Sequence, residues 1–116
     1  MKKTFLILLM VLLPAMLFAS TTGKIPGYVR DVSTGDPLAG TNVMLAGTSF
    51  GAASDMNGYY VILNVPPGEY TLKATMMGYS IAEFTALRVQ VDITSVQDIY
   101  LEQTAVEGEV VTVTAE

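Results

Sequence analysis

Clusters of turn-forming residues divide most of this chain into short stretches in which apolar and polar positions alternate. Gly, Pro, Asn and Asp gather at residues 34–38, 55–58 and 65–68, and Gly78 marks a further turn. The stretches between them are rich in β-branched and aromatic residues, and successive side chains of a strand point to opposite faces of a sheet. Because turns recur about every ten residues, the pattern predicts several short antiparallel strands that close over one core as a β-sandwich.

The alternation also predicts where the strands lie and which positions face the core. Pro26 cannot donate a ladder hydrogen bond, so the first strand is expected at a sheet edge. We expect strands at residues 24–32, 41–45, 50–54, 60–65, 70–74, 81–93 and 96–101. The side chains expected in the core are those of Ile25, Gly27, Val29, Val43, Leu45, Tyr60, Ile62, Val65, Tyr70, Leu72, Ala74, Leu87, Val89 and Val91.

The first 19 residues differ in character from the rest of the chain. Two lysines precede an uninterrupted apolar run at residues 5–13, and residues 14–19 combine a helix-breaking proline with small residues. This order is typical of a helical signal peptide at residues 1–19, cleaved after Ala19, with residues 20–23 as a short leader. A spanning helix needs about 20 apolar residues, which this run does not reach. We therefore expect export, and an uncleaved anchor is the alternative interpretation.

Removal of the signal peptide makes the chain strongly acidic. The sequence has 6 Lys or Arg and 11 Asp or Glu, and two of the cations lie in the signal peptide, so the mature chain carries a net charge of −7. Phosphate backbones are bound by clustered cations, whereas Lys24, Arg30, Lys73 and Arg88 are scattered singly. We therefore expect no nucleic-acid partner and interpret the acidity as that of a soluble exported surface.

The sequence contains neither cysteine nor histidine. A disulfide framework and lipid attachment at a cysteine are therefore excluded, and about a hundred residues can bury one sandwich core but not two. The usual general base, the soft metal ligands and the thiol nucleophile are missing as well. We therefore predict a non-catalytic protein with no catalytic residues, no cofactor and no metal site.

Residues 55–58, Asp-Met-Asn-Gly, superficially resemble the opening of a calcium-binding loop. Such a loop ends in a carboxylate, and that position falls here on Pro66. An ordinary hairpin turn with Asn57 or Gly58 in the left-handed region is the preferred interpretation. The alternative is that Asp31, Asp36 and Asp55 gather at one end of the sandwich.

Several aromatic residues invite a sugar-binding interpretation, because exposed rings stack on the apolar faces of carbohydrates. Tyr60 and Tyr70 occupy predicted core positions, and Tyr79 follows a glycine at a strand end, where its hydroxyl can satisfy backbone groups. The structural interpretation therefore accounts for most of the rings. Tyr28, Phe50 and Tyr59 are the candidates for ligand-facing aromatic residues.

Five turn blocks occur in an order that resembles a known family. They are residues 27–31 (Gly-Tyr-Val-Arg-Asp), 34–43 (Thr-Gly-Asp-Pro-Leu-Ala-Gly-Thr-Asn-Val), 58–62 (Gly-Tyr-Tyr-Val-Ile), 65–72 (Val-Pro-Pro-Gly-Glu-Tyr-Thr-Leu) and 78–79 (Gly-Tyr). Together they resemble the carboxypeptidase regulatory-like domain over residues 24–102. The resemblance implies a seven-strand transthyretin-like (prealbumin-like) β-sandwich with Greek-key connections. It implies nothing catalytic, because the zinc-binding residues of carboxypeptidases belong to a different domain.

The remaining residues, 103–116, form an acidic linker followed by a β-prone segment. In the family, such a segment resembles the region where TonB-dependent outer-membrane receptors carry their energy-coupling box, just before the plug and the barrel. Val110, Val111, Thr112 and Val113 are therefore candidates for a strand that adds to the sheet of a partner. The alternative is a disordered or loosely paired terminal strand of the chain's own sandwich.

The resemblance implies a non-catalytic accessory domain, exported to the periplasm or associated with the outer membrane. It is similar to the N-terminal extension of a TonB-dependent receptor, and the sequence can be interpreted as a truncated receptor. The expected partners are proteins, either a receptor plug and barrel or an energy-transducing periplasmic protein, with membrane contact only through an associated barrel. The alternative is a self-contained carbohydrate-binding or cell-surface adhesion module.

Overall fold

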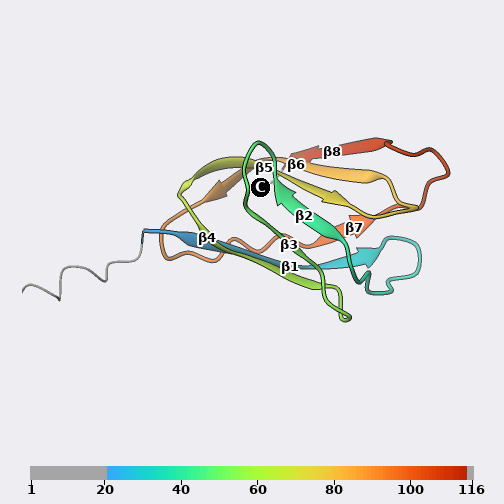
Figure 1. Cartoon of the computed structure of the whole chain (residues 1–116), viewed down its shortest axis with the longest axis horizontal. Helices are drawn as coiled ribbons and strands as arrows, with labels where there is room; N and C mark the ends of the chain where they lie inside the picture. The colour runs from blue at the N-terminus through green and yellow to red at the C-terminus, as the bar shows by residue number, and fades with distance from the viewer. Residues whose placement is uncertain (1–20, 115–116) are drawn as a thin grey trace, which may run out of the picture.

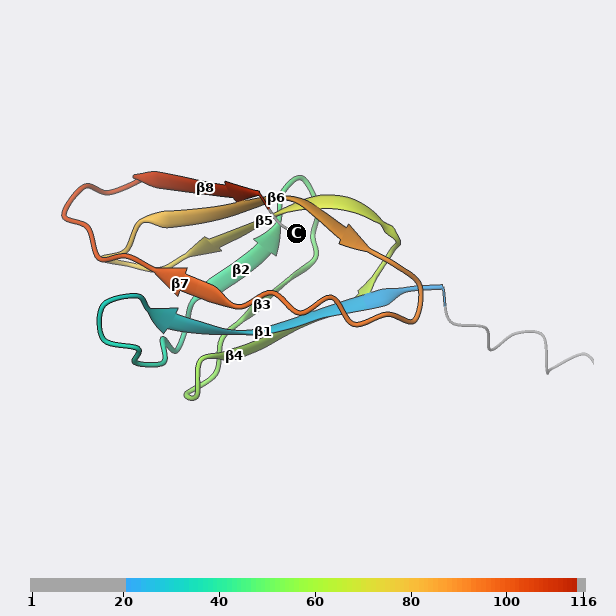
Figure 2. The same ribbon diagram turned by 180° about the vertical axis from the view of Figure 1, so that it is seen from behind.

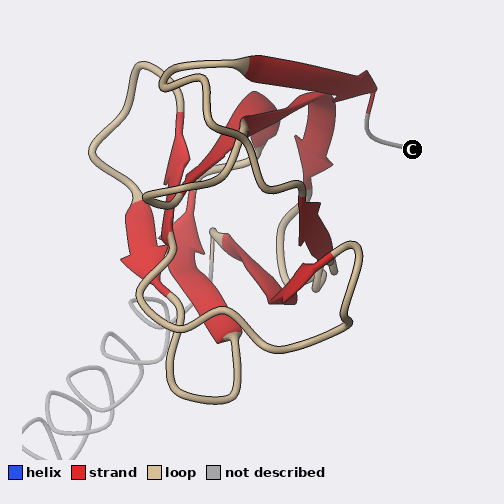
Figure 3. Ribbon diagram, turned by 90° about the vertical axis from the view of Figure 1, so that its right-hand side faces the viewer, coloured by secondary structure: helices blue, strands red, loops and turns tan. Residues whose placement is uncertain are grey.

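The computed structural model describes residues 21–114, and the signal peptide predicted at residues 1–19 lies outside this part of the chain. Every regular element within residues 21–114 is a β-strand (Figure 3). The eight strands are β1 (Gly23–Asp31), β2 (Asn42–Leu45), β3 (Gly51–Ala53), β4 (Tyr59–Val65), β5 (Gly68–Thr75), β6 (Ile81–Val89), β7 (Ile99–Leu101) and β8 (Val110–Thr114). The all-β class predicted from the spacing of the turns is confirmed.

The strands form two sheets that pack as a sandwich. The smaller sheet has the order β4-β1-β7, and the larger has the order β3-β2-β5-β6-β8. In Figures 1 and 2, β5, β6 and β8 lie on one side of the molecule, and β1 and β4 lie on the other. Strands β1 to β7 supply the predicted seven-strand sandwich, and β8 is an eighth strand from the tail of the chain.

One core fills the space between the two sheets. Alternate positions of β1 are buried, as are those of β2, since every second side chain of a strand points inward. Of the positions predicted to face the core, Tyr70 is only partly buried and Val91 is 42% exposed. The predicted core residues that the structure buries are Ile25, Gly27, Val29, Val43, Leu45, Tyr60, Ile62, Val65, Leu72, Ala74, Leu87 and Val89.

The sequence pattern predicted antiparallel strands only, but the sandwich also contains parallel pairings. Strand β7 runs parallel to β1, with Val29 opposite Ile99, and β8 runs parallel to β6. The connection from β6 to β7 passes from the larger sheet to the smaller one, and the connection from β7 to β8 passes back. A strand that arrives by such a crossover can lie parallel to its neighbour, whereas a tight hairpin forces antiparallel pairing.

Pro26 led to a wrong prediction, because β1 lies in the centre of the smaller sheet. Strand β1 pairs with β7 only over Val29–Asp31, so Pro26 lies beside the irregular segment that precedes β7. The backbone N–H of Gln97, in that segment, donates to the carbonyl oxygen of Pro26 at 2.9 Å. The nitrogen of Pro26, which carries no hydrogen, faces the same side as this carbonyl group. In the described part of the chain no strand pairs with β1 on that side at this position, so no ladder hydrogen bond is lost.

The turn at residues 55–58 connects the two sheets and does not close a hairpin. Strand β3 belongs to the larger sheet and β4 to the smaller one. The Asp55 carboxylate accepts hydrogen bonds from the backbone N–H groups of Asn57 and Tyr59, each at 2.9 Å. Gly58 has φ of 78°, and a Cβ there would lie 2.5 Å from the carbonyl oxygen of Val29. The turn therefore depends on a glycine both for its backbone angle and for close approach to β1.

Strand β6 is shorter than the predicted 81–93. It ends at Val89, and Asp92 has a left-handed φ of 57°, so the segment from Gln90 to Asp98 crosses between the sheets instead of extending the strand. The hydroxyl of Tyr60, a core side chain, donates a 2.5 Å hydrogen bond to the carbonyl oxygen of Gln97. This bond fastens the crossing segment to β4.

Candidate functional site

Strand β8 is the outermost strand of the larger sheet and pairs only with β6. Ile81 lies opposite Val110 and Thr85 opposite Thr114. All five side chains of β8 are exposed, and Val111, for example, is 43% exposed. Within residues 21–114 no strand pairs with its other edge. Strand β8 is therefore held mainly by backbone hydrogen bonds to β6, and its free edge offers unpaired backbone groups to another strand.

The inner side of β8 covers a slot between the two sheets. Val111 and Val113 line it together with Phe84 of β6 and Tyr100 of β7, and about 100 Å³ between them is unfilled. Unfilled space means lost dispersion contacts for the surrounding side chains. Strand β8 therefore closes this side of the sandwich with little side-chain packing.

The buried carboxylate of Asp31, which ends β1, holds the segment that leads to β8. Its Oδ2 accepts hydrogen bonds from the Tyr79 hydroxyl at 2.8 Å and from Nε2 of Gln103 at 2.9 Å. Its Oδ1 accepts from the backbone N–H groups of Ser33 at 2.8 Å and Thr34 at 3.2 Å. We call Asp31, Tyr79 and Gln103 the Asp31 clasp. Tyr79 was expected to bond to backbone groups, and it donates to this carboxylate instead.

Hydrogen bonding in the clasp shifts the acidity of both partners. The bond from Tyr79, followed by the backbone bond from Ser33, lowers the pKa of the Asp31 carboxyl below its ordinary value. The same bond raises the pKa of the Tyr79 hydroxyl, because its proton is shared with a carboxylate. Asp31 is therefore ionised, and Tyr79 neutral, throughout the neutral range.

The connection between the clasp and β8 is fixed at both of its ends. The backbone N–H of Ser80 donates to the carbonyl of Glu102 at 2.8 Å, and that of Ile81 donates to the carbonyl of Glu109 at 2.6 Å. Between these points the Thr104 hydroxyl donates to the Glu109 carboxylate at 2.7 Å. The sequence predicts an acidic linker here, and these hydrogen bonds position it so that β8 returns along β6.

Two of the three candidate aromatic residues lie together. Tyr28 of β1 is opposite Tyr59 of β4, and their ring centroids are 5.3 Å apart with a tilt of 60° between the planes. The Arg30 guanidinium carbon lies 5.4 Å from the centroid of the Tyr28 ring. These two rings therefore form a tilted pair next to a cation and not a flat platform. Phe50 lies apart from them, because it packs against the core beside β2 and β3.

Sequence reasoning missed another exposed aromatic residue on the smaller sheet. Tyr100 is 58% exposed and lies opposite Arg30 in the pairing of β7 with β1. The signal was present in the sequence, since Tyr100 alternates with the buried residues Ile99 and Leu101. The parallel pairing that brings it next to Arg30 could not be read from that signal.

Two of the three carboxylates considered for calcium are engaged elsewhere. Asp55 caps its own turn, and Asp31 is held in the clasp. Among residues 21–114 no three acidic side chains come close enough to hold a metal ion. In the same part of the chain no helix is long and apolar enough to cross a membrane.

The chain belongs to the CarboxypepD_reg-like domain family, whose model matches residues 25–113. The match extends through most of β8, so the tail strand lies within the matched region. The resemblance read from the turn blocks is therefore confirmed. No curated protein matches the chain.

Solved structures with a similar fold include parts of a protein complex and a pilin. Two are interface mutants of a type II cohesin–X–dockerin complex from Acetivibrio cellulolyticus, 29% and 30% identical, with TM-scores of 0.60 and 0.61. Each match covers 74% of this chain and 62% of the other. The third is the minor pilin GBS52 of Streptococcus agalactiae, 22% identical, with a TM-score of 0.55, covering 76% of this chain and 47% of that one. The pilin likeness concerns the fold alone.

Family and fold together define the class of protein. The chain is a regulatory-like β-sandwich domain. The matched family and these structural relatives are non-catalytic β-sandwich domains. Its most distinctive surface feature is the exposed tail strand β8, fastened to the body through the Asp31 clasp.

Proposed function

We propose that this protein is an exported interaction domain that acts as the N-terminal extension of a TonB-dependent outer-membrane receptor. The sandwich serves as a rigid spacer in the periplasm, and β8 is the strand that it presents to an energy-transducing partner. One observation carries the proposal: β8 is an edge strand whose five side chains are all exposed. Such a strand can add to another sheet, because β-augmentation needs only backbone groups.

The energetics of release support this mechanism. The valines of β8 are already 43–47% exposed, so leaving β6 uncovers only the remaining part of their apolar surface and the parts of Ala82 and Phe84 beneath them. The other loss is backbone hydrogen bonding, and each such bond contributes about 1 kcal/mol net. A partner sheet that offers an equivalent edge returns these bonds. Exchange between β6 and a partner therefore costs a few kcal/mol at most.

The structural relatives support a protein partner in a general way. The Acetivibrio cellulolyticus chains are parts of a cohesin–X–dockerin complex, in which protein modules bind one another. The alternative, carbohydrate binding through Tyr28, Phe50 and Tyr59, lacks comparable support. Two of these rings are tilted by 60° and the third packs on the core.

The proposal can be tested with a disulfide that locks β8 in place. Ala82 lies opposite Val111 in the pairing of β6 with β8, and both line the slot. Neighbouring strands bring Cα atoms to about 5 Å, within the range that a disulfide spans. Because the chain has no cysteine, the double variant Ala82→Cys with Val111→Cys forms a single defined bridge.

The experiment measures binding of the chain from Ser20 to Glu116 to the periplasmic domain of the TonB-type protein of the same bacterium. We expect the reduced double variant to bind, the oxidised one to fail, and a chain ending at Gly108 to fail as well. The reduced variant is the matched control, since it differs from the oxidised one by the bridge alone. Equal binding by the oxidised and reduced forms would refute strand release, and no binding by the unmodified chain would refute the proposed partner.

A further inference from the structure

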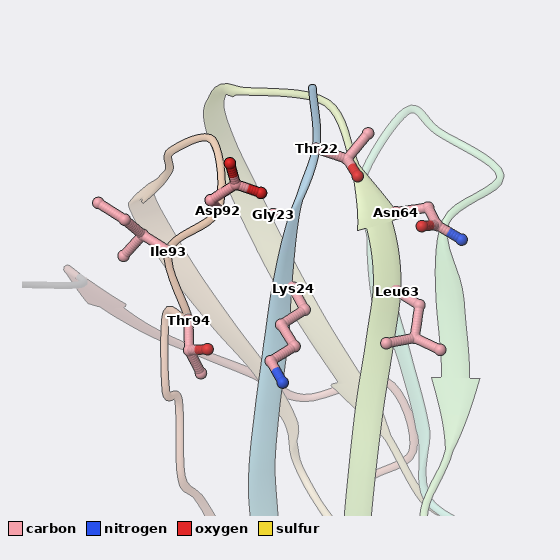
Figure 4. Close-up of a pocket in the computed structure, with 8 residues that line it drawn as sticks. All are labelled: Thr22, Gly23, Lys24, Leu63, Asn64, Asp92, Ile93 and Thr94. Atoms are coloured by element: carbon pink, nitrogen blue, oxygen red, sulfur yellow. The ribbon is translucent and has the colours of Figure 1, made fainter. Parts of the chain in front are cut away.

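A pocket of about 260 Å³ opens at the end of the smaller sheet where β1 begins (Figure 4). Five polar side chains line it, those of Thr22, Lys24, Asn64, Asp92 and Thr94. Leu63 and Ile93 add apolar surface on two sides. The pocket is remote from β8 in the sheet order, so it is independent of the proposed strand exchange.

Three local features of the fold build this pocket: a bulge in β4, the close approach of two backbones at Gly23, and left-handed backbone angles at Asn64 and Asp92. Strand β4 has a bulge opposite Lys24, because Ile62 pairs with Ile25 while Val65 pairs with Gly23, which leaves two residues, Leu63 and Asn64, opposite the single residue Lys24. A bulge redirects side chains, and here it places both residues at the rim of the pocket.

The opposite wall depends on a close approach of two backbones. A Cβ at Gly23 would lie 2.5 Å from the carbonyl oxygen of Gln90, so the turn that carries Asp92 and Ile93 reaches β1 only because residue 23 is glycine. The backbone N–H of Asp92 donates to the carbonyl oxygen of Thr22 at 3.1 Å and holds this wall. Asp92 and Asn64 both have left-handed φ angles, 57° and 58°, which these two residue types tolerate better than most.

The polar side chains of the pocket are not used by the fold. Within residues 21–114, none of the five makes a side-chain hydrogen bond, and Lys24 has no carboxylate within ion-pair distance. Buried polar side chains differ in this respect: the Ser54 hydroxyl, for example, donates to the carbonyl oxygen of Leu38 at 2.6 Å. The pocket therefore concentrates unused donors and acceptors.

Lys24 also differs from the other cations that follow the signal peptide. Lys73 stands opposite Glu83, and Arg88 opposite Glu69, in the pairing of β5 with β6. Arg30 lies over the Tyr28 ring. Lys24 is the cation that faces a pocket, and its amine extends away from Asp92, between Thr94 and Leu63 (Figure 4).

We propose that this pocket binds a carboxylate-bearing sugar residue, that is, a uronic acid. The Lys24 ammonium receives the sugar carboxylate, while Asp92 and Asn64 accept hydrogen bonds from hydroxyl groups at the other end of the ring. The two threonine hydroxyls can donate or accept, which suits a ligand with several hydroxyl groups. Leu63 packs against the apolar face of the ring. A pocket of this size is slightly below the usual range for small-molecule sites, which suits a ligand no larger than a single sugar ring.

The binding should be weak and dependent on salt. Lys24 is exposed, and an exposed ion pair contributes at most about 1 kcal/mol. The chain from Ser20 onward has a net charge of −7, which opposes an anionic ligand at long range. We therefore expect dissociation constants in the millimolar range, rising as the salt concentration rises.

The test is a titration of the chain from Ser20 to Glu116 with galacturonate, followed by NMR amide shifts, with galactose as the uncharged ligand of the same shape. We expect saturable shifts at residues 22–24, 63–64 and 92–94 with galacturonate and weaker binding of galactose. Lys24→Met should weaken galacturonate binding several-fold and remove the difference between the two sugars. Lys73→Met, which removes a cation elsewhere, is the matched control and should bind like the unmodified chain.

A second variant tests the hydroxyl contacts. Asn64→Gly keeps the left-handed backbone angle and deletes the amide, so it should weaken both sugars without unfolding the protein. The proposal is overturned if galacturonate gives no saturable shifts at the pocket well above millimolar concentration, or if Lys24→Met and Lys73→Met change its affinity equally. Neither outcome depends on whether β8 binds a protein partner.

Discussion

Replacing Tyr60 with phenylalanine should destabilise the domain at neutral pH and lose this effect at high pH. The Tyr60 ring is buried, and its hydroxyl donates to the carbonyl oxygen of Gln97. Burial, with a smaller contribution from the negative charge of Asp98, raises the pKa of this hydroxyl well above its ordinary value. The folded protein therefore keeps the proton, while the unfolded chain releases it at a pKa of about 10.

The two effects of the hydroxyl oppose each other as the pH rises. At pH 7 the substitution removes one hydrogen bond, which costs about 1 kcal/mol of unfolding free energy, and water can reach half-buried Gln97 to limit the loss. At about pH 11 ionisation of the unfolded chain lowers the stability of the Tyr60 protein by about 1.4 kcal/mol. Tyr60→Phe has no such group, so its deficit should disappear near that pH.

Urea unfolding of both proteins, followed by far-ultraviolet circular dichroism at pH 7 and at about pH 11, measures this difference. The other titrating groups are common to both proteins and cancel in the comparison. A deficit of Tyr60→Phe that stays constant between the two pH values would refute the inference that the folded state suppresses ionisation of Tyr60.

Two further predictions concern the clasp and the tail strand. Hydrogen bonds lower the pKa of Asp31 below its ordinary 3.8, so the stability that its carboxylate contributes is present above pH 3.8 and is lost as the pH falls through the lowered pKa. Asp31→Asn should therefore be less stable than the unmodified protein at neutral pH, and it should lose less stability on acidification. The measurement is the urea midpoint of the unmodified protein and of Asp31→Asn from neutral to acidic pH. Parallel dependence of the two midpoints on pH would contradict this prediction. Val111→Ile places one more methylene in the slot and should stabilise the domain by about 0.8 kcal/mol, whereas Val110→Ile, outside the slot, should not. Equal effects of the two isoleucine substitutions on the urea midpoint would show that the slot is not what limits the packing of β8.

The alternating pattern predicted the core because burial acts on every second residue of a strand. Strand β1 shows this, since Ile25, Gly27 and Val29 all lie inside as predicted. The turn at residues 55–58 was also located correctly, because only a few residue types adopt its backbone angles, and Gly58 has the left-handed φ. These features depend on local geometry alone.

The misjudged features depend on which strands become neighbours. Nothing in residues 99–101 distinguishes a parallel from an antiparallel strand, and the position of Pro26 was misjudged because its missing donor faces an irregular segment. The same applies to Tyr79, whose carboxylate partner lies 48 positions away in the chain. Such contacts join residues that no sequence window contains together.

The sequence by itself determined the all-β class, the turns, the acidic charge and most of the core, because each of these depends on residue type and on the period of a strand. The tertiary structure alone decided that β8 returns to β6, that Asp31 joins Tyr79 and Gln103, and that the β4 bulge and the Asp92 turn enclose one pocket around Lys24. The physical reason is that pairing and enclosure arise between distant segments, once crossovers have placed them side by side.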